Sequence, residues 1–374
     1  MSCKKRILMS VTTDLVSDQR VDKVCNTLFD MGFEVLLVGR RYKTSPQLEQ
    51  RRYQTKRLHL LFKKGKLFYA EMNVRLFFFL LFHRTDVFHA NDLDVLLPNV
   101  IIGKLKHKPI VYDSHEYFTE VPELVNRPKV QAIWKKIEQF CFPKVNHAFT
   151  VCEPIAQHYR QTYHKDVKVM RNIPFQRIYN RAKTKVELGL PEDKAILLLQ
   201  GTGINIHRGA EELVEAMTMI DGALLLVIGS GDVVGKLKET VAKQHTTDKV
   251  RFMNRLPFED LYNYTVWADL GFSLTKDICI NYRYALPNKL FDFIRARVPI
   301  VSSPNTEVAN LIQYYNIGFI LQEVTPECIA EAVNNLLKNR NLLEKFKYNT
   351  IQASQELSWE NESLVLQETY RQYL

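Results

Sequence analysis

The sequence predicts an α/β protein with two doubly wound, parallel-sheet domains in tandem. Short apolar runs of strand length alternate with segments of helical periodicity along the 374-residue chain. This alternation stops after residue 170 and starts again at residue 195. Apolar strands that alternate with helices are typical of parallel sheets covered on both faces. A chain of this length can form two domains, each with its own core.

The first domain is expected over residues 1–172. Its apolar runs predict strands at residues 6–11, 34–39, 87–90, 109–113, 148–152 and 167–170. Segments of helical pattern or length predict helices at 21–31, 94–104, 129–142 and 154–163. Helices between strands provide the long crossovers that parallel neighbours require.

The second domain is expected over residues 173–356 and begins with a linker. Residues 171–194 lack a strong period and contain Pro174 and Pro191. Strands are predicted at 195–200, 224–229, 250–253, 269–274, 298–302 and 318–321. Helices are predicted at 209–220, 234–242, 259–267, 288–296, 307–314 and 327–338. Residues 357–374 are expected to form a final helix that packs back on the first domain.

Positive charge is concentrated in one segment of the first domain. The chain carries 51 Lys and Arg against 41 Asp and Glu, and the segment between Arg40 and Arg75 holds eleven cations and two Glu. This segment therefore carries +9 of the net +10, and the apolar run 76–82 follows it. Basic residues beside bulky apolar ones suit an anionic membrane surface. The alternative is a solvated loop, and we expect the run 76–82 itself to be buried in the core.

Other features of the sequence bear on localisation. The run 76–82 has seven residues, whereas a spanning helix needs about 20. The apolar stretch 7–11 is too short for the core of a signal peptide. The six cysteines are scattered without metal-ligand spacing, which favours reduced thiols. We expect a cytoplasmic protein whose membrane contact, where there is one, is peripheral and on the inner face.

The strongest local signal for a binding site is the segment 284–303. Pro287 suits the first turn of a helix, and Asn288 follows it. The start of this helix offers free N–H groups to an anion, and Lys289 adds a positive charge. Asp292 lies one turn further on, where its carboxylate could accept hydrogen bonds from ribose hydroxyls. An amphipathic helix with a solvated Lys–Asp pair is the alternative interpretation.

Two glycine-rich turns follow predicted strands of the second domain. The first contains Thr202 and Gly203 and leads to Arg208 at the start of a helix, where it could pair with a diphosphate. The second contains Gly229 and Gly231. Neither has the dinucleotide or P-loop fingerprint, and tight turns need glycine in any case. Together with segment 284–303, the turns predict a nucleotide cradle.

Polar residues also follow strands of the first domain. His115 lies just after the predicted strand 109–113, and the segments 12–20 and 89–94 bring further ionisable residues to strand ends. Ligands of doubly wound sheets bind beyond the carboxyl ends of the strands. We therefore expect a site at this edge, although a lone histidine more often caps a turn.

These motifs together resemble the retaining glycosyltransferases of family four, also called glycosyl transferases group 1. The most specific parts are the segment 286–296, the pair Arg208–Gly209 and the segment 112–116. The resemblance implies the GT-B architecture, two Rossmann-like domains facing across a cleft. It implies transfer of a hexose from a UDP- or GDP-linked sugar to a glycan or lipid-linked acceptor, with retention of configuration. It also implies a role in cell-surface polysaccharide or glycolipid synthesis, and no bound metal or other cofactor.

The same resemblance assigns roles to the candidate residues. Asp292 would bind the donor ribose, and Arg208 and Lys289 would bind the diphosphate. His115 would lie near the transferred sugar. The expected catalytic residues are His115, Arg208 and Lys289, and the expected donor-binding residues are Thr202, Gly203, Arg208, Gly229, Gly231, Pro287, Asn288, Lys289 and Asp292.

The sequence departs from the family pattern at three positions. Tyr284 stands where the family has the first of two glutamates, and Asp292 replaces the second with a shorter side chain. Gly203 stands where the family commonly has an arginine. Arg208 and Lys289 must then supply more of the charge that holds the diphosphate.

Other functions stay open at this point. A sugar-nucleotide 2-epimerase has the same architecture, but Tyr284 in place of an acid does not favour it. A catalytically silent nucleotide-sugar-binding subunit fits the missing glutamate and arginine. A nucleic-acid binder is not expected, because the sequence has no recognised DNA- or RNA-binding signature.

Overall fold

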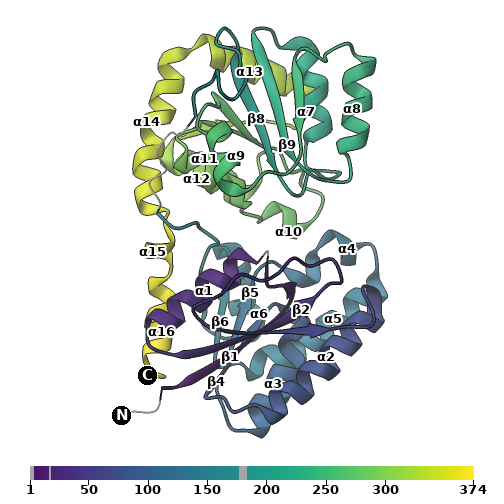
Figure 1. The fold of residues 1–374 in the computed structure, drawn as a ribbon, viewed down its shortest axis with the longest axis vertical. Helices are drawn as coiled ribbons and strands as arrows, with labels where there is room; N and C mark the ends of the chain where they lie inside the picture. The colour runs from purple at the N-terminus through teal and green to yellow at the C-terminus, as the bar shows by residue number, and fades with distance from the viewer. Residues whose placement is uncertain (1–3, 17, 177–182) are drawn as a thin grey trace. The chain divides into compact units, whose positions relative to one another are not determined.

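The computed structural model describes residues 4–16, 18–176 and 183–374. The chain divides into two compact units, Met1–Asn172 with Glu362–Leu374, and Ile173–Asn361. The predicted linker 171–194 falls partly on residues 177–182, which lie outside the described residues. Each unit contains one wholly parallel sheet with helices, so the predicted α/β class with two doubly wound domains is confirmed (Figure 1).

The first unit contains a seven-stranded parallel sheet in the order β3-β2-β1-β4-β5-β6-β7. Its strands are β1 Arg6–Asp14, β2 Glu34–Arg41, β3 Gln54–His59, β4 Val87–Asn91, β5 Ile110–Ser114, β6 His147–Thr150 and β7 Val167–Val169. Every residue of the central strands β4 and β5 is buried. This burial explains why each strand begins with a run of apolar residues. The order reverses between β1 and β4, so the switch point of this sheet lies between these two strands.

Helices cover the first sheet. They are α1 Gln19–Asp30, α2 Gly65–Phe82, α3 Leu96–Leu105, α4 Pro122–Val125, α5 Pro128–Cys141 and α6 Glu153–Tyr163, with short 3₁₀ turns at Leu93–Val95, Phe118–Glu120 and Phe142–Lys144. The helices α2, α3 and α5 neighbour one another in that order. Right-handed crossovers place these helices on one face of the sheet and α1 on the other.

The end of the chain belongs to the first unit. The helix α15, Trp359–Glu362, is followed by α16, Leu364–Arg371, which contacts α1. The hydroxyl of Tyr370 lies 2.6 Å from Nδ1 of the buried His89 on β4. Burial lowers the pKa of His89 to about 4, so this histidine is neutral at physiological pH. Phe33 packs edge-on against the Tyr370 ring at 5.8 Å.

The second unit contains a six-stranded parallel sheet in the order β10-β9-β8-β11-β12-β13. Its strands are β8 Ala195–Gly201, β9 Ala223–Gly229, β10 Val250–Met253, β11 Leu270–Ser273, β12 Ile300–Ser302 and β13 Gly318–Ile320. The order reverses between β8 and β11, which places the switch point there. Side chains of β8 alternate between two apolar clusters, with Leu197 and Leu199 in one and Ile196 and Leu198 in the other.

The helices of the second unit complete these two clusters. They are α7 Ala210–Ala216, α8 Val234–Lys243, α9 Phe258–Thr265, α10 Ile280–Arg283, α11 Asn288–Arg295, α12 Thr306–Tyr315, α13 Pro326–Lys338 and α14 Arg340–Glu356, with a 3₁₀ turn at Met217–Met219. Helix α11 buries Leu290, Phe291, Phe293 and Ile294. This burial fixes the start of α11, where the predicted site residues lie.

Several predicted elements need correction. The strand β3 and the helices α2, α4, α10 and α14 were not predicted, and residues 359–374 form two short helices rather than one. The basic segment between Arg40 and Arg75 is not one solvated loop, because it contains β3 and the first turns of α2. The expectation that run 76–82 lies in the core is wrong in part: Leu76 and Leu80 are buried, whereas Phe78 and Phe82 are 52% and 79% exposed. Among the described residues, no helix is both long and apolar enough to span a membrane.

Candidate active site

Ionisable side chains gather at the carboxyl ends of strands in each unit. His115 belongs to the first unit, and the other predicted site residues belong to the second.

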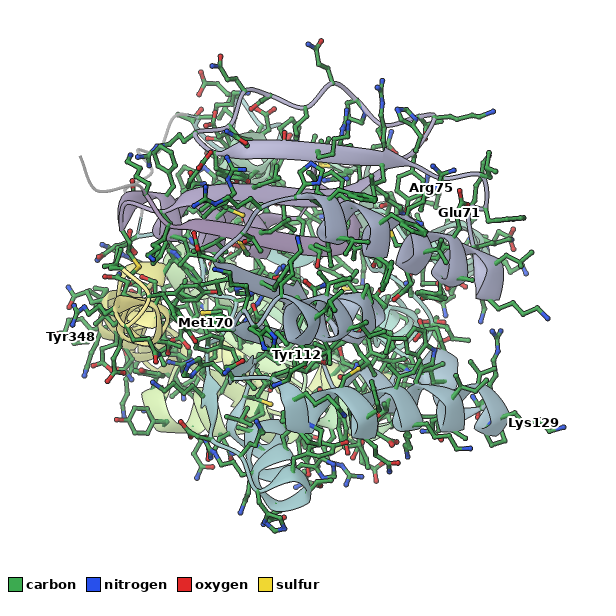
Figure 2. The ribbon with its side chains drawn as sticks, turned by 90° about the horizontal axis from the view of Figure 1, so that it is seen from below. Glu71, Arg75, Tyr112, Lys129, Met170 and Tyr348 are labelled. Atoms are coloured by element: carbon green, nitrogen blue, oxygen red, sulfur yellow. The ribbon has the colours of Figure 1, made fainter. Side chains whose placement is uncertain are left out.

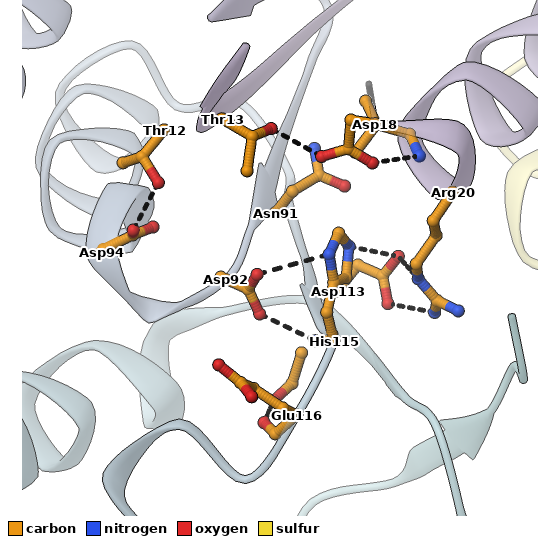
Figure 3. Close-up of polar contacts among 12 residues, drawn as sticks. Thr12, Thr13, Asp18, Arg20, Asn91, Asp92, Asp94, Asp113, His115 and Glu116 are labelled. Carbon is orange, nitrogen blue, oxygen red and sulfur yellow. Dashed lines mark hydrogen bonds and ion pairs between the residues drawn. The ribbon is translucent and has the colours of Figure 1, made fainter. Parts of the chain in front are cut away.

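In the first unit, a buried ion pair joins α1 to the end of β5. The Arg20 guanidinium donates to both carboxylate oxygens of Asp113, at 3.0 and 2.7 Å (Figure 3). The two side chains are 3% and 0% exposed. Burial alone would raise the pKa of Asp113, but Arg20 and then His115 hold it well below its usual range. Asp113 therefore stays ionised in the interior.

His115 lies between two carboxylates. Its Nδ1 is 3.3 Å from Asp92 Oδ2, and its Nε2 is 3.3 Å from Asp113 Oδ2 (Figure 3). Its backbone N–H donates to Asp92 Oδ1 at 2.8 Å. Burial would lower the pKa of His115, but Asp92 and Asp113 more than offset it and raise the pKa to about 9. At neutral pH the ring is thus a cation with both nitrogens protonated, and it is a poor general base.

The backbone at Asp92 is unusual. Its φ of 67° and ψ of 165° lie in a region that is almost exclusive to glycine. Its N–H donates to the carbonyl of Asp113 at 2.9 Å, which ties the turn after β4 to the end of β5. Such strain persists only where the surroundings hold it, and here it directs the Asp92 carboxylate toward His115.

Asp94, two residues after Asp92, has a different partner. Asp94 accepts a hydrogen bond from the Thr12 hydroxyl at 2.5 Å, whereas Asp92 lies beside His115 (Figure 3). Burial, and then the charge of Asp92, raise the pKa of Asp94 to about 7. Within residues 4–16, 18–176 and 183–374, no group of three or more His, Cys, Asp or Glu is arranged to hold a metal ion.

In the second unit, Arg208 lies beside the end of β11. Its Nη1 is 3.4 Å from the hydroxyl of Thr275, and its Cζ lies 4.0 Å from the centroid of the Tyr282 ring. Its Nε is buried and has no hydrogen-bond partner among the described residues. An unsatisfied buried donor on a cation is costly, and an anion could supply the missing acceptor.

Lys289, in the first turn of α11, is electrostatically coupled to Arg208. Burial, and then the positive charge of Arg208, lower the pKa of Lys289 to about 8. No carboxylate of the described residues offsets these effects. The pair therefore forms a local excess of positive charge at the switch-point edge of the second sheet, which an anion would stabilise.

The other predicted site residues of this segment, Pro287, Asn288 and Asp292, lie at or near the start of α11. Pro287 is the N-cap, one position before the helix, rather than in the first turn as predicted. Its carbonyl accepts from the N–H of Leu290 at 3.0 Å. Asn288 is exposed and Asp292 is half-buried one turn into the helix.

The glycine-rich turns contact each other. A Cβ on Gly229 would lie 1.8 Å from the carbonyl oxygen of Gly201, and one on Gly231 would lie 1.9 Å from that of Ile204. The N–H of Ser230 donates to the Gly201 carbonyl at 3.1 Å. Close packing of two backbones is therefore sufficient to require glycine at positions 229 and 231. These turns shape the edge of the site whether or not they contact a ligand.

The first turn leaves room for a ligand. Thr202 and Gly203 are exposed, and a Cβ on Gly203 would meet nothing within 4 Å. Gly209, by contrast, has φ of 74°, and its Cβ would lie 2.3 Å from Cβ of Leu274. This contact seats the start of α7 against the end of β11, which brings Arg208 to Thr275.

Sequence reasoning missed two residues of this cluster, Thr275 and Tyr282. Thr275 follows β11, the strand beside β8 at the switch point, so the strand-end rule could have found it. Tyr282 lies on α10, a four-residue helix that has no sequence periodicity to reveal it. In the first unit, Asp92 and Asp113 were recognised only as parts of strand-end segments.

Two family descriptions match successive parts of the chain. "Glycosyltransferase Family 4" matches residues 19–173, and "Glycosyl transferases group 1" matches residues 180–353. A curated relative, chitobiosyldiphosphodolichol beta-mannosyltransferase from Candida albicans, is 28% identical over 196 residues. This alignment covers 49% of the chain and 42% of the relative, so the chain matches less than half the length of that protein.

Solved structures share the fold over almost the whole chain. Sucrose-phosphate synthase from Thermosynechococcus elongatus has a TM-score of 0.79 at 16% identity and covers 99% of both chains. Anabaena HepE in complex with UDP has a TM-score of 0.75 at 14% identity and covers 98% of this chain and 100% of its own. WaaG, a glycosyltransferase involved in lipopolysaccharide biosynthesis, has a TM-score of 0.72 at 13% identity, with 96% and 99% covered.

The two matched segments fall on the two parallel-sheet units, and glycosyltransferases are among the structures that share this two-domain fold. The chain belongs to the family-four, group 1 glycosyltransferases and has their GT-B fold.

Proposed function

We propose that this glycosyltransferase moves a hexose from a nucleotide-sugar donor to a glycan or lipid-linked acceptor, with retention of configuration. The observation that carries the proposal is the pair Arg208 and Lys289: the charge of Arg208 lowers the pKa of Lys289, and no carboxylate of the described residues offsets that effect. The buried Nε of Arg208, which has no hydrogen-bond partner in the described part of the chain, adds an unfilled donor to this pair. The diphosphate of a nucleotide sugar supplies the charge and the acceptors that the pair lacks.

The same pair accounts for leaving-group departure. Negative charge grows on the diphosphate as the glycosidic bond breaks, and preorganised cations stabilise it most at that moment. The start of α11 adds its N–H groups and the positive end of its helix dipole. In this proposal the two side chains serve where other enzymes use Mg²⁺. Asp292, one turn into α11, would accept hydrogen bonds from the donor ribose.

His115 has a supporting role in the proposal. Because Asp92 and Asp113 raise its pKa to about 9, the imidazolium donates hydrogen bonds and does not accept a proton from the acceptor. It would orient or polarise a hydroxyl of the donor sugar. A departing phosphate oxygen would then take the proton of the acceptor hydroxyl, as the family resemblance implies.

Relatives support the nucleotide-sugar class and suggest an acceptor class. HepE has been solved with UDP and with UDP-glucose, and the curated relative is named as a mannosyltransferase that acts on a dolichol-linked sugar. WaaG is described as involved in lipopolysaccharide biosynthesis. By analogy we propose a cytoplasmic enzyme of cell-surface polysaccharide or glycolipid synthesis, with a UDP- or GDP-linked donor.

A donor panel tests the proposal. The protein is incubated with UDP- and GDP-sugars, and thermal shift, donor turnover and the anomeric configuration of the product are recorded. We expect Arg208→Ala to lower kcat/KM by at least tenfold, about 1.4 kcal/mol, and Asp292→Ala to raise donor KM. Lys236→Ala removes an exposed lysine on α8 and serves as the matched control. Turnover should continue in EDTA.

Other results of these experiments would refute the proposal or indicate a different function. Unchanged donor kinetics in both Arg208→Ala and Asp292→Ala would refute the site. Activity lost in EDTA and restored by Mg²⁺ or Mn²⁺ would refute the metal-free mechanism. Binding of a nucleotide sugar without turnover would indicate a silent subunit, for which Tyr284 in place of an acid is the motivating feature. Epimerised donor without transfer would indicate a 2-epimerase.

A further inference from the structure

Helix α2 of the first unit is apolar on two opposite sides. Phe68, Met72, Leu76 and Leu80 recur every four residues and are buried against the domain. A second stripe recurs on the outward side, where Val74, Phe78 and Phe82 are 56%, 52% and 79% exposed. A helix that is apolar all round is expected inside a core or in contact with a membrane. Only one side of α2 is covered in this chain.

The neighbouring helices extend the exposed apolar surface. On α3, Ile101 and Leu105 are exposed, and on α5, Val130, Ile133 and Phe140 are exposed. Helix α3 contacts both α2 and α5, so the three helices form a continuous layer, seen side by side in Figure 2, where Glu71 and Arg75 mark α2 and Lys129 marks α5. We call this surface the α2–α3–α5 face, defined by Val74, Phe78, Phe82, Leu105, Ile133 and Phe140.

Positive charge accompanies the apolar side chains on these helices. The three helices carry six cations, namely Lys66, Arg75, Lys104, Lys129, Lys135 and Lys136. Their two acids are both engaged. Glu71 accepts the N–H groups of Leu61 and Phe62 and pairs with Arg75, and Glu138 is buried and accepts from tyrosine hydroxyls. Two of the cations are also engaged, Arg75 with Glu71 and Lys135 with Glu120. Among the described residues, no ion pair engages the other four, Lys66, Lys104, Lys129 and Lys136, and these are the cations that the face offers beside its apolar side chains.

We propose that the α2–α3–α5 face docks on an anionic lipid bilayer. The helices would lie parallel to the bilayer surface, because the inner side of α2 is packed against the domain. Phe78, Phe82 and Phe140 would enter the headgroup region, and the lysines would pair with lipid phosphates, each contributing about 1 kcal/mol near the surface. Lysine stems can lie along the apolar surface while their amines reach the phosphates.

The positive charge of the α2–α3–α5 face also favours a bilayer over a second copy of this chain as its binding partner. A two-fold interface would bring the same patch of both protomers together and so place lysines against lysines. Like charges in such an interface oppose association. The proposal is independent of the donor site, because none of the donor-site residues lies on these helices. The face shares only Lys66 and Arg75 with the basic segment Arg40–Arg75. Several other cations of that segment are engaged within the unit, for example Arg51 with Asp22 and Arg57 with Asp14.

Vesicle flotation tests the surface. Full-length protein is mixed with vesicles of phosphatidylcholine alone or of phosphatidylcholine with phosphatidylglycerol. We expect flotation with the anionic vesicles only, and less binding as salt rises. Phe78→Gln combined with Phe82→Gln should weaken binding by at least about tenfold, since each loses the burial of a large side chain. Lys129→Glu with Lys136→Glu should do the same.

The control is an exposed aromatic residue elsewhere. Tyr348→Gln changes a side chain on α14 of the second unit that is 74% exposed, and should leave flotation unchanged. Circular dichroism and donor affinity check that each variant is folded. No binding of the wild type to anionic vesicles would refute the proposal, as would equal loss in Tyr348→Gln. A dimer that Phe78→Gln with Phe82→Gln dissociates would identify a second copy as the occupant instead. Turnover measured without vesicles tests the proposed function separately.

Discussion

Neighbouring charges change the ionisation of His115 and Lys289 in opposite directions. Carboxylates beside His115 raise its pKa to about 9, whereas burial and Arg208 lower the pKa of Lys289 to about 8. The chain's own carboxylates therefore stabilise the charged form of His115, whereas Arg208 disfavours the charged form of Lys289, which a bound anion would stabilise. The identities of both residues were evident from the sequence, and Asp113 lies only two positions before His115. The other neighbours, Asp92 of His115 and Arg208 of Lys289, come from distant segments and become visible only in the fold.

The first residue-scale prediction concerns His115. Its imidazolium should titrate near pH 9 in the folded protein, well above the usual value near 6.5. Asp92→Asn removes one of the two carboxylates, so the midpoint should fall by about one unit or more. The measurement is the pH dependence of the His115 ring signals by NMR. A wild-type midpoint near 6.5 would contradict the two ion pairs.

The second residue-scale prediction concerns Lys289. With a pKa of about 8, this lysine is partly deprotonated at pH 8, and a bound diphosphate favours its charged form. Binding of UDP at pH 8 should therefore take up protons, and affinity should fall as pH rises above 8. Calorimetry in buffers of different ionisation enthalpy measures this uptake. Lys289→Met should abolish it, and uptake that persists in this variant would have to come from another group.

At the scale of elements, the sequence predicts the central strands well because they are continuously apolar. The edge strand β3 was missed because its residues Gln54–His59 are polar except for Leu58, and none is fully buried. Helix α14 contains Asn349, Thr350 and Ser354, residues of modest helix propensity, and it is held by packing on α11, α12 and α13. The contact between the two glycine-rich turns was also not predicted, because the sequence does not show which turns pack against each other.

The element-scale prediction uses two glycines with left-handed backbone. Gly209 and Gly222 have φ of 74° and 65°, so alanine is strained at both. Only at Gly209 would the new Cβ also clash, with Leu274 at 2.3 Å, whereas nothing lies within 4 Å at Gly222. Gly209→Ala should cost about 1–3 kcal/mol more than Gly222→Ala. Thermal and denaturant unfolding of both variants measure the difference, and equal losses would show that α7 can shift away from β11.

At the scale of the whole molecule, the first unit is built from both ends of the described chain. Residues 362–374 join residues 1–172, and Arg171 anchors this return through hydrogen bonds to Glu362 at 2.6–3.1 Å. Length and the restart of the strand–helix alternation predicted two domains. The sequence predicts that residues 357–374 pack on the first domain, but not that α16 meets α1 and β4, because the apolar stripe of a short helix does not specify the elements that it covers.

The prediction at this scale is a selective loss of protection. A chain that ends at Glu362 lacks α16 and the Tyr370 hydroxyl that pairs with His89. Hydrogen–deuterium exchange should then accelerate in α1 and β4, while β8 and β9 of the second unit exchange as before. Tyr370→Phe removes only the hydrogen bond and should cost about 1 kcal/mol. Faster exchange spread evenly over both units would contradict this assignment.

The return of the chain to the first unit also sets an order of events during translation. The ribosome makes residues 173–361 before it makes the helix that covers α1 and β4. The second unit can therefore finish folding while the first still exposes the surface that α16 will cover. The part of the protein that is synthesised first is completed last, so a stalled or shortened chain would leave the N-terminal unit open to chaperones and proteases.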